Sequence, residues 1–168
     1  MTVGRHRAAP GTRGDLTHRR RPPAVLGADL VGRPNLAHDF AEILNAGEVE
    51  RFDDLVHPDY VNHNRYAGPG REGVKAVFAG FLQAMPDLEV TVHDAFAAGD
   101  RVIGRYSYTG TFTGPLLGNA PTGERVTMTS IDVWRVEDGR FVEHWDEINS
   151  LELFVQLGAV AAPGSEAS

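Results

Sequence analysis

Helical spacing of apolar residues runs through the first half of the chain. Four of them fall at i, i+4, i+7 and i+8: Leu36, Phe40, Ile43 and Leu44. They predict a helix between Pro34 and Gly47, residues suited to a helix start and stop. A short second helix is expected over 49–56, ended by His57-Pro58 because the residue before a proline avoids helical geometry. The same period predicts a third helix over 71–85.

Alternation of apolar and polar residues replaces the helical period in the second half. It predicts strands over 88–97, 101–113, 124–136 and 140–149. A last short helix is expected over 151–157, and 60–64 is expected as a polar segment. Helices followed by consecutive strands indicate an α+β fold, with the helices on one face of a curved antiparallel sheet. Such a sheet encloses a conical pocket suited to a small ligand.

Charge divides the chain into a tail and a body. Residues 1–34 hold seven arginines and two aspartates, which gives them a net charge of +5. Since the whole chain has a net charge of −7, residues 35–168 carry a net charge of −12. We therefore expect a basic flexible tail over 1–33, one domain over 34–160 and a frayed end over 161–168. The acidic body argues against nucleic-acid binding. No apolar run reaches the length of a membrane span, so a cytoplasmic protein is expected.

The predicted turn at 137–139 fixes how the strands on either side of it pair, and so which of their residues share a face of the sheet. With a three-residue loop, Val136 pairs with Arg140, which places Asp132 opposite His144 and Ser130 opposite Asp146. Asp132, His144 and Asp146 then lie on one face with Trp134. A two-residue loop would separate Asp132 from the other two. The opposite face would carry four apolar residues that a second copy could cover, giving a homodimer or homotetramer: Ile131, Val133, Phe141 and Trp145.

Carboxylates and an imidazole are the only plausible catalysts that this sequence offers. The chain has no cysteine, no glycine-rich phosphate loop and no serine elbow. Two aspartates beside a histidine suit general acid–base chemistry if the face lines a pocket, and are merely solvated if it does not. His63 is a second candidate, within a segment that also holds Tyr60, Asn62 and Asn64 and that could equally be a turn. No spacing typical of a metal site is present, so none is expected.

Several short motifs in order resemble the SnoaL-like polyketide cyclase (ester cyclase) family of the NTF2-like superfamily. The resemblance covers about 35–160, and its motifs are Asn62-His63-Asn64, Met85-Pro-Asp-Leu88, Gly110-Thr-Phe-Thr-Gly114, Pro121-Thr-Gly123, Ile131-Asp-Val-Trp-Arg-Val-Glu-Asp-Gly139 and Val142-Glu-His-Trp-Asp146. Two positions depart from the family pattern. Asn149 stands where many relatives have a second aspartate, and Phe112 stands where histidine is common.

The resemblance implies an NTF2-like α+β barrel that closes a polyketide ring by an intramolecular aldol reaction without metal or organic cofactor. By position, Asp146 resembles the family's general acid and base, His63 a pocket histidine, and Asp132 a polar pocket residue. Tyr60, Asn62, Asn64, Phe112, Ser130, Trp134 and His144 are the expected substrate contacts. A hydrophobic, polyketide-like small molecule is the expected substrate.

Two other functions stay open from the sequence. Enzymes similar to limonene-epoxide hydrolase share the fold and open epoxides with an Asp-Arg-Asp arrangement, but Ser130 stands where the arginine would be expected. A non-catalytic protein that binds a small molecule is the third possibility, because the fold alone supports all three.

Overall fold

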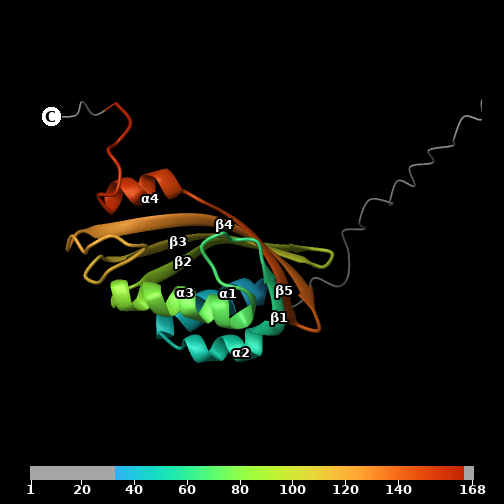
Figure 1. Cartoon of the computed structure of the whole chain (residues 1–168). Helices are drawn as coiled ribbons and strands as arrows, with labels where there is room; N and C mark the ends of the chain where they lie inside the picture. The colour runs from blue at the N-terminus through green and yellow to red at the C-terminus, as the bar shows by residue number, and fades with distance from the viewer. Residues whose placement is uncertain (1–32, 165–168) are drawn as a thin grey trace, which may run out of the picture.

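The computed structural model describes residues 33–164 as four α-helices, one 3-10 turn and five strands (Figure 1). The helices are α1 (Arg33–Ala46), α2 (Phe52–Leu55), α3 (Gly70–Ala84) and α4 (Ser150–Gln156), with the turn η1 at Val49–Arg51. The strands are β1 (Val56–Asn62), β2 (Glu89–Ala98), β3 (Arg101–Thr111), β4 (Arg125–Glu137) and β5 (Arg140–Ile148). The α+β prediction is confirmed. Residues 1–32 of the predicted basic tail and the last four residues of the chain lie outside the described residues, whereas Arg33 begins α1.

The five strands form one curved sheet in the order β1-β5-β4-β3-β2. β2 to β5 are antiparallel neighbours, as predicted, whereas β1 pairs with β5 in parallel. The predicted antiparallel strands therefore form four of the five strands, and the sheet gains a fifth, parallel edge strand where 60–64 was expected only as a short polar segment. Pro58 lies within β1, and it is tolerated there because an edge strand needs only half of its backbone hydrogen bonds.

The turn between β4 and β5 has two residues, not the three that were predicted. Asp138 and Gly139 both have positive φ, 47° and 76°, so Glu137 pairs with Arg140. A bulge then inserts Val142 between the pairs Val136–Phe141 and Arg135–Glu143. Beyond it the register has shifted by one residue.

The bulge has two consequences for the predicted faces. Asp132 lies directly opposite Asp146, and Trp134 lies opposite His144, so all four still share the inner face. Phe141, however, was wrongly assigned to the outer face. It is fully buried and its ring stacks on Trp134 at 4.6 Å.

Helices α1, α2 and α3 cover one face of the sheet, and the other face carries no long helix in the described part of the chain (Figure 1). Their apolar stripes meet an aromatic core, where Phe40 of α1 contacts Phe52, Phe78, Tyr106 and Trp134. α4 continues from β5 and covers the edge of β4 beyond it. There the side chain of Gln156 bonds both the N–H and the C=O of Thr127. None of the described helices is long and apolar enough to cross a membrane.

Candidate active site

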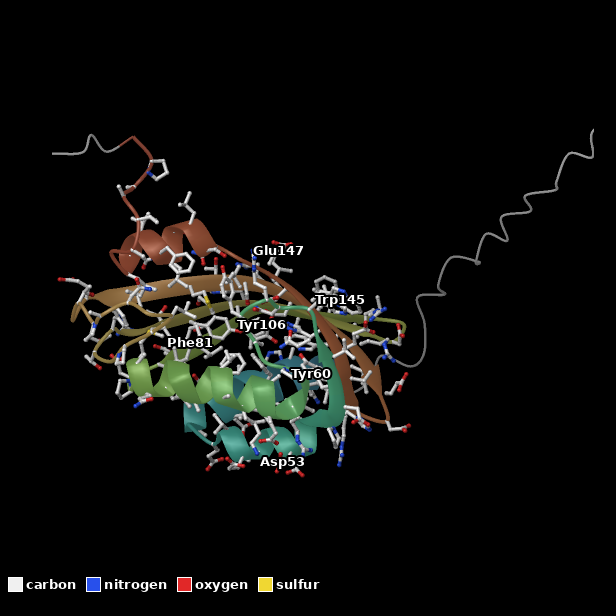
Figure 2. The ribbon with its side chains drawn as sticks, in the orientation of Figure 1. Asp53, Tyr60, Phe81, Tyr106, Trp145 and Glu147 are labelled. Atoms are coloured by element: carbon white, nitrogen blue, oxygen red, sulfur yellow. The ribbon has the colours of Figure 1, made fainter. Side chains whose placement is uncertain are left out.

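A cavity of about 430 Å³ opens between α3 and the inner face of the sheet. Four successive inward positions of β4 line it, in the order Trp134, Asp132, Ser130 and Met128. Ionisable and amide side chains gather at β4, β5, β1 and the residues just after β1, and apolar side chains of α3, β4 and the loop before β4 make most of the remaining wall. Figure 2 shows Tyr60 and Phe81 in the space between the sheet and the helices. The cavity therefore has a polar part within a largely apolar enclosure.

Asp132 and His144 form a buried pair at the polar part of the cavity. The Oδ1 atom of Asp132 lies 2.8 Å from Nε2 of His144, and Asp132 and His144 are 4% and 8% exposed. The Ser130 hydroxyl donates to the other oxygen of Asp132. The remaining imidazole nitrogen, Nδ1, lies 3.1 Å from Oδ1 of Asn62. Every polar atom of the pair therefore has a protein partner.

Asp146 lies beside this pair with a different partner. The side-chain nitrogen of Asn64 donates to its Oδ2 at 2.5 Å, and the orientation of that amide is fixed because its oxygen accepts the backbone N–H of Tyr66 at 2.7 Å. Burial raises the pKa of Asp146 above the ordinary aspartate value, while His144 and Asn64 oppose the shift. A half-buried carboxylate with a raised pKa is suited to accept a proton.

Two tyrosines complete the polar part of the cavity. Tyr60 of β1 and Tyr108 of β3 are nearly fully buried, 4% and 2% exposed. Burial raises the pKa of both phenols far above the ordinary tyrosine value, and the negative charge of Asp132 adds to the effect. Both hydroxyls therefore keep their protons at neutral pH and can donate to a bound oxygen.

Eight of the ten residues predicted for the site line the cavity: Tyr60, Asn62, Asn64, Ser130, Asp132, Trp134, His144 and Asp146. His63 and Phe112 do not. The ring of His63 stacks on Trp145 at 4.9 Å, on the face of the sheet away from the helices, and its Nε2 contacts Glu143 at 3.0 Å. Figure 2 shows Trp145 on that outer side. Phe112 is fully buried in the core, where Gly123 and Glu124 hold its backbone.

Treating 60–64 as a strand, in which successive side chains alternate between the two faces of the sheet, would have predicted the correct face for each residue. Tyr60, Asn62 and Asn64 face the cavity, and His63 faces outward. The sequence interpretation missed Tyr108, which shares the inner face of β3 with Tyr106. It also missed the apolar wall that α3 and the loop before β4 contribute: Val74, Val77, Phe78, Phe81, Pro115, Leu116 and Leu117. Helical spacing over 71–85 places Val74, Val77, Phe78 and Phe81 on one face of the predicted helix, but it does not indicate what that face packs against.

Among the described residues, one group has the spacing for a cation: Asp132, His144 and Asp146 each have a ligand atom within 4.8 Å of the others. Both nitrogens of His144 and both oxygens of Asp132 already have protein partners. A cation would have to replace those hydrogen bonds, so the donor set as folded does not fit one.

Comparison with known proteins decides the family. The sequence profile described as SnoaL-like polyketide cyclase matches residues 35–157. The chain belongs to the SnoaL-like polyketide cyclase family. It is 28% identical over 121 residues to nogalonic acid methyl ester cyclase of Streptomyces nogalater, covering 68% of this chain and 88% of that protein.

Solved structures agree with this membership and with the NTF2-like fold. TsrD from Streptomyces laurentii shares 34% identity with a TM-score of 0.70, over 75% of this chain and 94% of that one. IdmH from Streptomyces antibioticus, a suggested polyketide cyclase, shares 32% identity with a TM-score of 0.64, over 76% of this chain and 99% of that one. The family resemblance predicted from the motifs is thus confirmed.

Proposed function

We propose that this member of the SnoaL-like polyketide cyclase family closes a ring by an intramolecular aldol reaction, with Asp146 as the general base. The observation that carries the proposal is the position of Asp146 in the cavity. Its carboxylate has a pKa raised by burial, a single amide donor holds it in place, and apolar walls surround it. The similarity to a nogalonic acid methyl ester cyclase supports a polyketide ester as substrate.

The reaction needs one base and no net change in atoms. The carboxylate of Asp146 removes a proton from the carbon next to a carbonyl, which leaves an enolate. The enolate carbon then forms a bond to a second carbonyl carbon of the same molecule, whose oxygen becomes an alkoxide. Asp146 returns its proton to that alkoxide, so the product is an isomer of the substrate.

Hydrogen-bond donors around Asp146 would stabilise the enolate oxygen. Tyr60 and Tyr108 keep their protons because burial raises their pKa. Their hydroxyls are fixed by the surrounding core before the substrate arrives, which is the condition under which donors lower a barrier most. His63, which the sequence analysis named as a catalytic candidate, lies on the outer face and takes no part in the proposed reaction.

Conversion of nogalonic acid methyl ester, followed by mass spectrometry, tests the proposal. We expect a product of unchanged mass, and Asp146→Asn should lower kcat by about a thousandfold. Glu143→Gln is the matched control, because it lies on the same strand with its side chain on the outer face. An unchanged rate in Asp146→Asn would remove the carboxylate from the mechanism. Conversion of limonene epoxide to a product heavier by one water would instead support epoxide opening, although no arginine or lysine is among the described cavity residues.

We further propose that the outer face of the sheet joins two or more copies of the chain. One apolar row crosses four neighbouring strands through the pairs Phe96–Ile103, Ile103–Val133 and Val133–Trp145. Phe96 is 56% exposed, and Ile131 beside the row is 51% exposed. Light scattering should give the mass of a dimer or tetramer, and Val133→Glu should give a monomer. A monomeric wild-type protein would contradict this assembly.

A further inference from the structure

The orientation of the Asn62 amide is fixed independently of its neighbour His144. Its Oδ1 accepts the backbone N–H of Asn64 at 2.9 Å, so the oxygen and not the nitrogen occupies this position. The same oxygen lies 3.1 Å from Nδ1 of His144. A carbonyl oxygen only accepts hydrogen bonds, so Nδ1 must carry a proton.

The second nitrogen of His144 then determines how many protons the Asp132–His144 pair holds. Nε2 lies 2.8 Å from Oδ1 of Asp132, and a contact of this length between two polar atoms requires a proton between them. With Nδ1 already protonated, the pair is either an imidazolium beside a carboxylate or a neutral imidazole beside a carboxylic acid. Both forms have zero net charge.

We infer that Asn62 and His144 are positioning residues for the reaction: Asn62 obliges Asp132 and His144 to share one proton, which leaves Asp146 as the only net negative charge among the described residues that line the cavity. This inference rests on the proposed role of Asp146 for its catalytic meaning, while the proton count itself rests on hydrogen-bond geometry alone.

The charge matters because Asp132 lies directly opposite Asp146 in the strand register. A second full negative charge there would repel the carboxylate of Asp146. The other titratable residues that line the cavity are the three tyrosines Tyr60, Tyr66 and Tyr108. Tyr106, from β3, also interacts electrostatically with Asp132. Across the cavity, α1 contributes Phe40 and α3 contributes apolar side chains and glycines, so neither helix brings a charge into the cavity.

Asn62→Leu separates this role from a packing role. Without the acceptor, a protonated Nδ1 would be buried without a partner, so His144 should lose that proton and keep the one that faces Asp132. The cavity then holds two negative charges instead of one. The pKa of Asp146 should rise, and the acid limb of kcat/KM should move to higher pH by about one unit.

Two further variants make the prediction specific. His144→Gln also removes the shared proton, so it should move the acid limb of kcat/KM to higher pH as well. The double variant Asn62→Leu/His144→Gln should show no additional shift of this limb. Asp132→Asn in the Asn62→Leu background removes the extra charge and should return the limb to its original position. A variant that acted only by loosening the fold would not be rescued in this way.

Nitrogen-15 NMR of labelled histidine tests the proton count without any substrate. The His144 signal, assigned by its absence in His144→Gln, should show a protonated Nδ1 at neutral pH, and Asn62→Leu should abolish it. Carbon-13 titration of Asp146 should show the same pKa increase as the rate profile. If Nδ1 is unprotonated in the wild type, or if Asp132→Asn fails to restore the titration, the inference is wrong. If both NMR results hold but no polyketide ester is converted, the proposed function fails and the proton count stands.

Discussion

A histidine and a carboxylate lie against each other on both faces of the sheet, at nearly the same distance. His144 and Asp132 are 2.8 Å apart on the inner face, and His63 and Glu143 are 3.0 Å apart on the outer face. The inner side chains are 10% and 6% exposed, whereas the outer ones are 45% and 23% exposed. Water and salt screen the outer pair, so its contact contributes little. The inner pair has only protein partners, so each of its protons must be accounted for.

The two tryptophans of the chain divide between the faces in the same way. Trp134 is 1% exposed and stacks between Phe141 at 4.6 Å and His144 at 5.3 Å. Trp145 lies between His63 and the guanidinium of Arg101, which is 4.7 Å from its ring. A comparison of equivalent substitutions on the two faces therefore tests how much each face contributes to stability.

Truncating the tryptophans should give the largest difference. Trp134→Ala removes a fully buried ring and should lower the free energy of unfolding by about 4 kcal/mol. Trp145→Ala should cost about 1 kcal/mol or less, measured at protein concentrations low enough to dissociate any dimer. Urea denaturation followed by far-ultraviolet circular dichroism measures both. Equal losses would show that the outer face is as much a part of the core as the inner one.

Truncating the histidines should give the next largest difference. His144→Ala leaves Asp132 buried without its partner and should cost about 3 kcal/mol. His63→Ala leaves Glu143 with Arg135 and solvent, so the urea midpoint should hardly change. A large loss in His63→Ala would mean that stacking on Trp145 stabilises the fold beyond what its exposure suggests.

Glu143 and Asp146 of β5 should respond to acid in opposite directions, and this effect should be smaller than those of the tryptophan and histidine substitutions. Hydrogen bonds from Arg135 and His63 lower the pKa of Glu143, so this group stabilises the fold above the ordinary glutamate pKa and loses that effect as pH falls through its lowered value. Burial raises the pKa of Asp146, so its charge destabilises the fold at neutral pH and protonation relieves this.

Urea midpoints of two variants across the acid range separate these contributions. At neutral pH, Glu143→Gln should be less stable than the wild type and Asp146→Asn more stable. Both differences should shrink as the pH falls through the respective folded-state pKa. If Asp146→Asn is less stable than the wild type at neutral pH, burial of the Asp146 carboxylate does not lower the free energy of unfolding.

The sequence predicted most elements because their signals are local. The stripe from Leu36 to Leu44 and the alternation along β2 to β5 depend only on neighbouring residues. β1 was missed because Pro58 and the polar residues near it resemble a turn, and only pairing with β5 makes the segment a strand. That pairing joins residues about eighty positions apart, which no local pattern contains.

The candidate site was predicted in its residues but not in its geometry. Asp132, His144 and Asp146 were placed on one face for an incorrect reason, since the assumed loop length was wrong and the bulge at Val142 restored the alternation. His63 was placed in the pocket because the family resemblance carries a histidine there. Its actual side follows from Asn62 and Asn64 facing inward, which becomes evident only when the segment is treated as extended chain.

The bulge at Val142 also decides which residue of β5 lies opposite Asp132 in the candidate site. If the same residues paired regularly, with Val142 in the ladder, Asp132 would lie opposite Trp145, and β5 would present an indole where it now presents Asp146. Deleting Val142 would remove the bulge together with the extra residue, so the pairs Trp134–His144 and Asp132–Asp146 would remain. Residue count and bulge therefore act together, because one residue fewer without the bulge presents the same inner face of β5 as one residue more with it.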